Sequence, residues 1–354
     1  MNLHEGLGYK FLSPQEQQVY KILLEAFSET ASSLDCSQID RNIDIMKVVQ
    51  SVLGDNPYII YFDKTKISIE ESSIKERIVI TKGREKQQVR TRTTSSGRRI
   101  IFSGVCTKPQ AEKMLASLEK KANQIISTIK KTADNDYSLL INLYKYLQEN
   151  VRYSGLKIIS FDLHNAYGAL INGKAVCDGF SSAFSLLAEK LGFKCMLAAG
   201  NSAYSAASYA NHAWNIIKIK NKYYHMDITW DARKFEDSKV HSFTYFANND
   251  LEIAADHKWD NKTAPVCSGS DFSYYKRNGL FINDLKQLYA SIALHLKNKV
   301  SIFQYKFSVD YDRPSGKKTA DLILGEAIKY GGGNVKISYS WNENTRCFFA
   351  RILS

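Results

Sequence analysis

The stretch from Asn165 to Phe193, NAYGALINGKAVCDGFSSAFSLLAEKLGF, decides the central part of the fold. It predicts a glycine-containing loop followed by an amphipathic helix, because apolar residues recur at helical spacing: Phe180, Ala183, Phe184, Leu187 and Leu191. Gly192, directly after them, is a typical helix stop. Cys177 then lies in the first turn, where unpaired N–H groups favour a thiolate over a thiol. A small apolar residue can also simply pack there, so an inert buried thiol is the alternative.

The composition is that of a globular chain. Its 354 residues are 44% hydrophobic and 24% charged, which is enough for a sizeable core and two or three domains. No apolar run approaches the roughly 18 to 20 residues that cross a bilayer. The first residues, MNLHEGLGYKFLSPQEQ, contain no basic segment followed by an apolar one, so we expect a cytoplasmic protein, with an exported mature form as the alternative.

The cysteines predict free thiols in a reducing compartment. Neither a disulfide framework nor a structural zinc site is expected, because the six are scattered without metal-finger spacing: Cys36, Cys106, Cys177, Cys195, Cys267 and Cys347. We expect no cofactor and no metal.

The positive charge is concentrated in one segment. The chain has a net charge of +12, and residues 74–131 hold nine Lys and six Arg against four Glu. Within it, KGREKQQVRTRTTSSGRR (82–99) is either a site for an anionic polymer or a solvated hairpin whose charges protect a strand edge. The lack of interleaved aromatic residues favours the solvated hairpin. The polyanion hypothesis rests on four arginines: Arg90, Arg92, Arg98 and Arg99.

Hydrophobic periodicity and turn signals predict an α+β chain with three parts. Residues 1–107 are expected to form helices within 13–53, a strand at 58–62 and a β-hairpin between 66 and 102. Residues 108–270 form the core, with helices from 108 to about 151, the Cys177 helix, a strand at 194–199, a loop of small residues at 201–210, a hairpin of strands 211–220 and 223–230, and an irregular or helical segment at 243–265. Residues 271–354 form a small α/β domain that reads strand, helix, strand, helix, strand, strand.

The hairpin supplies the partners that a nucleophilic cysteine needs. His212 opens its first strand and Asp227 lies in its second. An imidazole can take the proton of a thiol, and a carboxylate on the other ring nitrogen fixes the tautomer and stabilises the imidazolium. The order Cys, His, Asp is the one that papain-like enzymes use.

At these residues the chain resembles the transglutaminase-like superfamily, in particular bacterial proteins with a transglutaminase core domain. The matching motifs are AYGALINGKAVCDGFSSAF around Cys177, NHAWNIIKI around His212 and YYHMDITWD around Asp227; the segments DYSLLINLYKYLQENVRYS and DNPYIIYF match more weakly. The resemblance implies a papain-like core, in which the helix that carries Cys177 packs on an antiparallel sheet that carries His212 and Asp227.

The resemblance also implies cysteine-dependent acyl transfer on a peptide or protein substrate. Cys177 would attack an amide carbonyl to give a thioester, His212 would act as base and then acid, and Asp227 would orient His212. Water as acceptor gives proteolysis or deamidation, and an amine gives a crosslink. The oxyanion would be held by backbone N–H groups at the start of the helix, next to Asp178, and by the Tyr167 hydroxyl, although mammalian crosslinking members have tryptophan there. The alternative is an idle scaffold that binds a protein or polyanion through the basic hairpin. Oligomeric state is not predicted.

Local pattern leaves the carboxylate partner of His212 open. A tight turn at Asn221-Lys222 would place Asp231 opposite His212, whereas the family pattern favours Asp227. His225 could be a metal ligand or an alternative base, but a satisfied hydrogen-bond pair is the more common arrangement. Three other histidines are expected to be structural or at the surface: His164, His241 and His257. Trp214 and Trp230 are expected to fill the core or to form the wall of a cleft.

Overall fold

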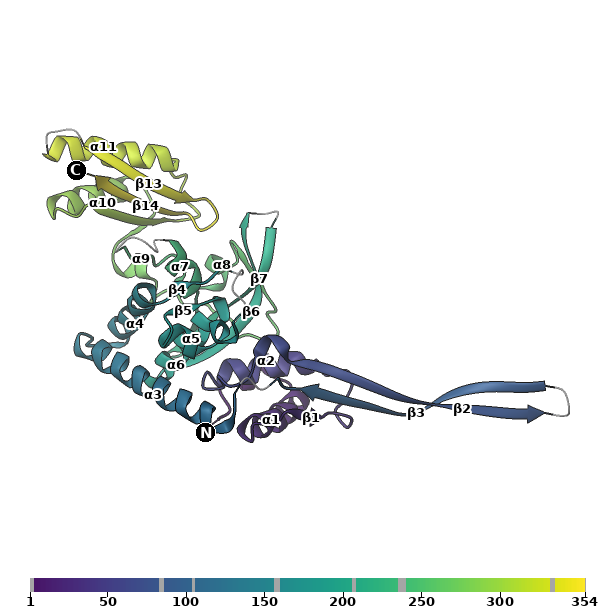
Figure 1. Cartoon of the computed structure of the whole chain (residues 1–354). Helices are drawn as coiled ribbons and strands as arrows, with labels where there is room; N and C mark the ends of the chain where they lie inside the picture. The colour runs from purple at the N-terminus through teal and green to yellow at the C-terminus, as the bar shows by residue number, and fades with distance from the viewer. Residues whose placement is uncertain are drawn as a thin grey trace. The chain divides into compact units, whose positions relative to one another are not determined.

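The computed structural model divides into two compact units (Figure 1). Unit 1 comprises residues 1–132 and 150–197, and unit 2 comprises residues 133–149 and 198–354. The structure describes residues 3–82, 86–103, 106–155, 160–205, 208–234, 240–331 and 335–353, with the side chains of 73–82, 86–96, 204–205, 208–209, 233–234 and 331 left out. The predicted domain boundaries at 107 and 270 stay a prediction.

Unit 1 begins with helices whose start signals are local. After a short 3-10 helix, η1 (Gly8–Phe11), α1 (Pro14–Ser28) begins with a capping box: the Ser13 hydroxyl accepts from the Glu16 N–H, and the Glu16 carboxylate accepts from the Ser13 N–H. The helix α2 (Ile45–Asp55) packs against α1, and α3 (Lys108–Lys131) carries the apolar face predicted for it. These helices therefore follow the sequence prediction closely.

A three-stranded antiparallel sheet completes the N-terminal part of unit 1. Its order is β1 (Ser33–Asp35), β3 (Lys86–Ile101), β2 (Ser68–Lys82), and a 3-10 helix, η2 (Lys64–Lys66), precedes β2. The long β2–β3 pairing runs from Ser68 opposite Ile101 to Lys82 opposite Lys86. The predicted β-hairpin is thus present.

In the run 58–62, Tyr58 is half-buried and the other four residues are buried, but the run forms no strand, so the strand predicted there is wrong. The chain turns instead, with the Ile59 N–H donating to the Asn56 carbonyl (3.0 Å). Phe62 packs in an aromatic cluster with Phe27 and Phe102, at ring-centroid distances of 5.2 and 5.7 Å. The β-branched and aromatic residues of this run reflect burial, which strands and buried turns share.

The predicted helix with Cys177 at its start is α6 (Cys177–Lys190), and ten of its fourteen residues, 179–188, are buried. It ends before Gly192, which has a φ of +95° that favours glycine. Short elements surround its start: β4 (Arg152–Tyr153), paired in parallel with β5 (Lys174–Ala175), the 3-10 helix η3 (Phe161–His164) and α5 (Ala166–Leu170). Both α5 and η3 pack against α6.

Unit 2 contains α4 (Asp136–Asn150) up to residue 149 and most of a five-stranded sheet of order β10-β6-β7-β8-β9, whose strand β6 begins in unit 1. The strands are β6 (Lys194–Ser205), β7 (Ser208–Ile219), β8 (Lys222–Met226), β9 (Phe246–Asn248) and β10 (His257–Trp259). Residues 201–205 and 208–210 belong to strands β6 and β7, so the loop predicted at 201–210 is wrong. Small residues are compatible with strands when neighbouring backbones approach closely.

The β7–β8 hairpin turns one residue earlier than predicted. Its loop is Lys220-Asn221, with Lys220 at a φ of +56°, and the register pairs Asn215 with Met226. The strand β8 ends at Met226, and residues 228–234 form the helix α7 (Ile228–Lys234), followed later by α8 (Asp250–Ile253). The strand predicted through Trp230 is therefore too long.

The C-terminal part of unit 2 has the predicted order of strands and helices. A short helix, α9 (Tyr274–Arg277), precedes β11 (Phe281–Ile282), α10 (Leu285–Lys297), β12 (Ile302–Phe307), α11 (Gly316–Gly331), β13 (Lys336–Asn342) and β14 (Cys347–Leu353). The strands form one sheet of order β11-β12-β14-β13. A continuous apolar core that includes Phe303, Tyr305 and Phe348 joins the sheet to its helices.

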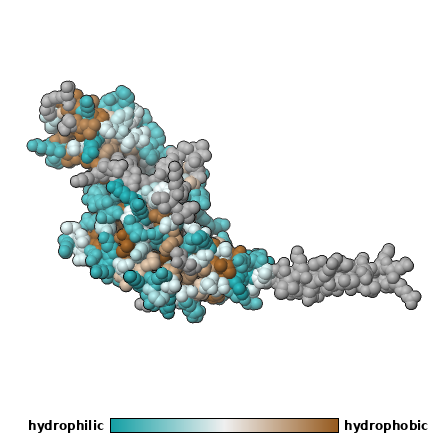
Figure 2. Space-filling view, viewed as in Figure 1, coloured by the Kyte–Doolittle hydropathy of each residue, from teal (hydrophilic) through white to brown (hydrophobic). Residues whose placement is uncertain are grey.

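The surface seen in Figure 2 is largely hydrophilic over the residues that are coloured, with hydrophobic groups gathered at the C-terminal part of unit 2. The large exposed apolar side chains of this part include five on α10 and α11: Leu285, Tyr289, Leu294, Ile328 and Tyr330. Among the helices in the described ranges, none is both long enough and apolar enough to cross a lipid bilayer.

Candidate active site

Cys177 is the first residue of α6 and is half-buried. The backbone before it is anchored by a hydrogen bond from the Val176 N–H to the Leu163 carbonyl (3.0 Å). Gly179 allows this close approach, because a Cβ at that position would lie 2.2 Å from the Leu163 oxygen. The first turn of a helix leaves backbone N–H groups without intrahelical partners. Cys177 is thus rigidly placed beside possible donors for an oxyanion.

Asp178 pairs with His164, which was expected to be structural or at the surface. The Nδ1 atom of His164 lies 3.0 Å from each oxygen of the Asp178 carboxylate, and this hydrogen bond raises the pKa of His164 above its ordinary value although partial burial opposes the shift. The carboxylate also accepts from the Gly179 N–H (3.0 Å). Because a carboxylate accepts hydrogen bonds, only the backbone N–H of Asp178 is suited to an oxyanion role.

Tyr167 lies on α5, which packs against α6 in unit 1. The side chain is half-buried, and the backbone N–H of Tyr167 donates to the Asn165 side chain (2.9 Å), which caps the short helix. An oxyanion role for its hydroxyl stays a prediction.

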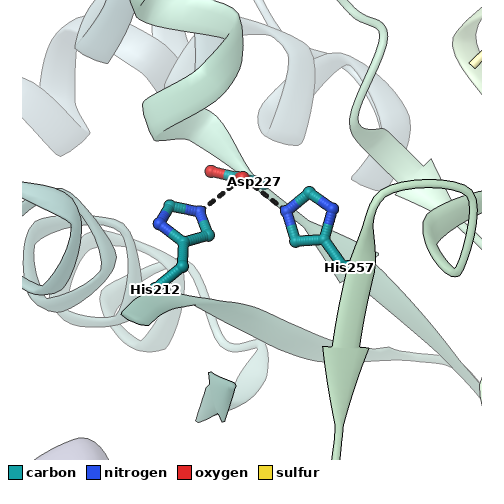
Figure 3. A group of neighbouring side chains, drawn as sticks. All are labelled: His212, Asp227 and His257. Atoms are coloured by element: carbon teal, nitrogen blue, oxygen red, sulfur yellow. Dashed lines mark hydrogen bonds and ion pairs between the residues drawn. The ribbon is translucent and has the colours of Figure 1, made fainter. Parts of the chain in front are cut away.

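His212 and Asp227 lie together in unit 2 (Figure 3). His212 is on β7 and Asp227 is between β8 and α7, and the His212 Nε2 atom is 2.7 Å from the Asp227 Oδ2 atom. A carboxylate can only accept, so Nε2 carries a proton and Nδ1 is the nitrogen of the neutral ring that bears a lone pair. Nδ1 is therefore the atom of His212 that can act as a base.

Asp227 is fully buried and stays ionised. Burial alone would raise the pKa of its carboxyl, but the charges and hydrogen bonds of His212 and His257 hold that pKa well below its usual range. Its second oxygen, Oδ1, accepts from the Trp230 N–H (3.2 Å), and the Asp227 N–H donates to the Tyr245 carbonyl (3.1 Å). The carboxylate is therefore fixed from both sides.

Asp231 has a different set of partners. It lies within α7, where its carboxylate accepts from the Tyr144 hydroxyl (2.8 Å) and the Ser242 hydroxyl (2.5 Å), and from the N–H groups of Thr244 (3.0 Å) and Tyr245 (2.8 Å). These bonds tie the segment 242–245 to α7. The alternative that places Asp231 behind His212 is not what the hydrogen bonds show; Asp227 holds that position.

His257 was expected to be structural or at the surface, and it lies beside Asp227. Its side chain is fully buried on β10, with Nε2 3.0 Å from the Asp227 Oδ2 atom and Nδ1 2.6 Å from the Asp256 Oδ1 atom (Figure 3). Local pattern offers no signal for this contact except an adjacent acidic residue, because β10 reaches the site through its pairing with β6.

His225 forms the satisfied pair that the sequence favoured, with Asp250. Its Nε2 atom lies 2.9 Å from Asp250, and its Nδ1 atom accepts from the Trp214 indole N–H (2.9 Å). Trp214 is fully buried and Trp230 nearly so, and both rings lie next to the His212 ring, at centroid distances of 5.8 and 6.1 Å. The two tryptophans therefore pack the surroundings of His212.

Two clusters in the described residues have the side-chain types and spacing of a metal site, His212–Asp227–His257 and His225–Asp250–Cys267. In the second cluster, the Nδ1 atom of His225 accepts from the Trp214 indole N–H, so its Nε2 atom carries the proton that faces Asp250. A protonated nitrogen has no lone pair for a metal, so the hydrogen bonds of His225 favour an imidazole–carboxylate pair over a metal ligand.

The basic hairpin is only partly described. Arg90 and Arg92 lie outside the residues whose side chains are described. Arg98 is mostly buried with its Nε atom 3.6 Å from Glu71, and the exposed Arg99 lies opposite Glu70 in the strand register. The polyanion site at Arg90, Arg92, Arg98 and Arg99 stays a prediction.

The central segment of the chain is similar to a known protein family. Residues 123–228 match the model of the transglutaminase-like superfamily. Among curated proteins, none matches the chain.

Two solved structures are similar over part of the chain. A transglutaminase (TGase) is 11% identical, covers 48% of this chain and has a TM-score of 0.30. A candidate cysteine protease from Cytophaga hutchinsonii is 15% identical, covers 46% and has a TM-score of 0.27. The matches span 46% and 65% of those two structures' own lengths.

The matched segment includes Cys177 and His212 and ends directly after Asp227, and the structure has the mixed helices and antiparallel sheet that the resemblance implied. Over residues 123–228, this chain is thus similar to the transglutaminase-like superfamily.

Proposed function

We propose that the protein catalyses cysteine-dependent acyl transfer on a peptide or protein amide, with Cys177 as nucleophile, His212 as general base and acid, and Asp227 as the carboxylate that orients His212. The observation that supports it best is the His212–Asp227 hydrogen bond (2.7 Å), because it fixes the tautomer with a basic Nδ1 atom. The superfamily match over 123–228 includes all three residues.

The reaction has two steps. The Cys177 Sγ atom loses its proton to His212 Nδ1 and bonds to the amide carbonyl carbon; the C–N bond then breaks, and the leaving amine takes that proton. The product is a thioester on Cys177. An acceptor, water or a primary amine, then loses a proton to His212 and replaces the sulfur, and the thiol recovers its proton. Water gives hydrolysis or deamidation, and an amine gives a crosslink.

The other cysteines provide a reference for the reactivity of Cys177. Burial raises the pKa of Cys36, Cys106 and Cys267, and raises that of Cys195 well above the ordinary range. Cys106 is half-buried like Cys177 and is thus the matched reference for reactivity. Selective labelling over the fully buried thiols would show only that they are inaccessible.

The test measures alkylation of each cysteine by iodoacetamide between pH 5 and pH 9, with the sites resolved by mass spectrometry. We expect Cys177 to react below pH 8 and ahead of Cys106, and His212→Ala to abolish that advantage. If Cys177 and Cys106 react alike in the native protein, the nucleophile proposal is wrong and the idle scaffold is the better description. Dimethylated casein with and without a fluorescent primary amine then separates hydrolysis from amine transfer.

A further inference from the structure

A second imidazole shares the carboxylate of Asp227. The Oδ2 atom of Asp227 lies 2.7 Å from His212 Nε2 and 3.0 Å from His257 Nε2, and the two rings lie on opposite sides of it (Figure 3). The other nitrogen of His257, Nδ1, faces Asp256 at 2.6 Å. The buried order of groups is therefore Asp256, His257, Asp227, His212.

The charge of His257 follows from the number of N–H groups that its two neighbours require. Both of its neighbours are carboxylates, and a neutral imidazole has only one N–H to donate. Each carboxylate is also stabilised as an anion by another donor: the Tyr245 hydroxyl bonds to Asp256 Oδ2 (2.7 Å), and the Trp230 N–H bonds to Asp227 Oδ1 (3.2 Å). Both contacts of His257 are satisfied together when the ring carries two protons.

We propose that His257 is a permanently protonated positioning residue, an imidazolium held between Asp227 and Asp256 that fixes the Asp227 carboxylate and offsets its charge towards His212. The link to catalysis rests on the proposed function; the charge and position of His257 do not.

The surroundings of His257 suit a buried cation. Its ring centroid lies 5.0 Å from that of Trp214 on β7, 5.1 Å from Trp230 on α7 and 5.4 Å from Tyr245, and aromatic rings at such distances stabilise cations. The titratable groups facing it are Asp227, Asp256, Tyr245, His212 and, more remotely, His225. Burial by itself lowers the pKa of His257, but the two carboxylates raise it above the ordinary value.

A permanent positive charge on His257 makes His212, the proposed general base, harder to protonate. When His212 takes a proton, two imidazolium rings 5.5 Å apart share one carboxylate, and their repulsion opposes that protonation. His212 then stays neutral to lower pH than in an isolated His–Asp pair, so its Nδ1 lone pair is available at neutral pH. Removing the His257 charge should raise the pH at which His212 loses its proton.

The test is a titration of ¹⁵N-labelled imidazoles by NMR in the full chain, in a Cys177→Ala background that excludes any effect of the thiol and needs no activity. In this protein we expect His257 to show two protonated nitrogens at pH 7. His257→Gln should move the His212 midpoint up by about one to two pH units, from two charges at this separation and an effective dielectric constant of about 20. Asp256→Asn should also move it up, because His257 loses one of the anions that hold its second proton.

His225→Gln is the matched control, because it removes another buried imidazole that pairs with an aspartate without touching Asp227. It should leave the His212 midpoint in place. A neutral His257 at pH 7, or an unchanged midpoint in His257→Gln, overturns the proposal, and the first of these needs no variant at His257. Failure of the proposed function would appear instead as equal alkylation of Cys177 and Cys106, which does not bear on this titration.

Discussion

Asp231→Asn should mainly reduce thermal stability, whereas Asp227→Asn should mainly reduce the reactivity of Cys177. Asp231 accepts four hydrogen bonds, two at each oxygen. An asparagine there keeps one oxygen and turns an NH2 group towards the donors at the other, so two bonds are lost. At about 1 to 3 kcal/mol for each bond to a charged group, the cost is about 3 kcal/mol.

The predicted loss is measurable as thermal stability. For a compact unit of 150 to 250 residues, about 3 kcal/mol corresponds to a decrease in Tm of roughly 6 to 12 °C. The carboxylate that bonds to His212 is that of Asp227, however, so in Asp231→Asn the reactivity of Cys177 per folded molecule should stay near that of the unchanged protein. Reactivity is measured as the iodoacetamide rate at 15 °C and pH 7, normalised to the folded fraction from circular dichroism.

Asp227→Asn should reduce reactivity per folded molecule instead. The amide carries no charge to stabilise the His212 imidazolium, and comparable changes in His–Asp pairs reduce acyl-transfer rates by about 10⁴-fold. Some stability is lost as well, because His257 loses an anion. The reasoning is refuted if Asp231→Asn removes reactivity while Asp227→Asn leaves it unchanged.

Three further predictions concern the packing, titration and charge of unit 1. Burial, helped by the charge of Asp55, raises the pKa of Glu189 to about 8, above the unfolded value of 4.5. The acid therefore costs stability increasingly as pH rises from 4.5 to 8, and Glu189→Gln should match the unchanged protein at pH 5 but have a higher Tm at pH 8.5. Gly179→Ala should lower Tm and slow alkylation of Cys177, because its Cβ would collide with a backbone carbonyl, whereas Gly325→Ala in α11, with open space around its Cβ, should be neutral or stabilising by up to about 1 kcal/mol. Reversing the hairpin charges should weaken retention on heparin with little change in Tm, and unchanged retention would favour the solvated hairpin; the residues are Arg90, Arg92, Arg98 and Arg99.

Elements with a strong local signal could be predicted from the sequence. The helix α6 follows from one apolar stripe and one glycine, and the C-terminal order of strands and helices follows from alternating periods. The run Tyr58–Phe62 shows the limit of such reasoning, because its composition indicates burial and the pairing partner that would make it a strand is a long-range property.

Contacts between distant segments could not be predicted. His257 lies 30 residues from Asp227 in the chain. It reaches Asp227 because β10 pairs with β6, which lies next to β7 on the side away from β8. A lone histidine beside an aspartate is common at protein surfaces, so local pattern carries no information about this neighbour. A similar argument holds for the pairing of His164 with Asp178.

The choice between Asp227 and Asp231 depended on where a strand becomes a helix, and strict alternation could not reveal that point. Because α7 begins at Ile228, Asp227 is the residue before a helix, and its Oδ1 atom accepts from Trp230, the third helical residue, as a capping residue does. The same carboxylate therefore caps α7 with one oxygen and binds two imidazoles with the other. Serine can take over the cap but not the imidazole contacts. If Asp227→Ser keeps α7 intact but reduces the reactivity of Cys177 as Asp227→Asn does, the effect arises from the lost carboxylate beside His212 and not from a disordered helix.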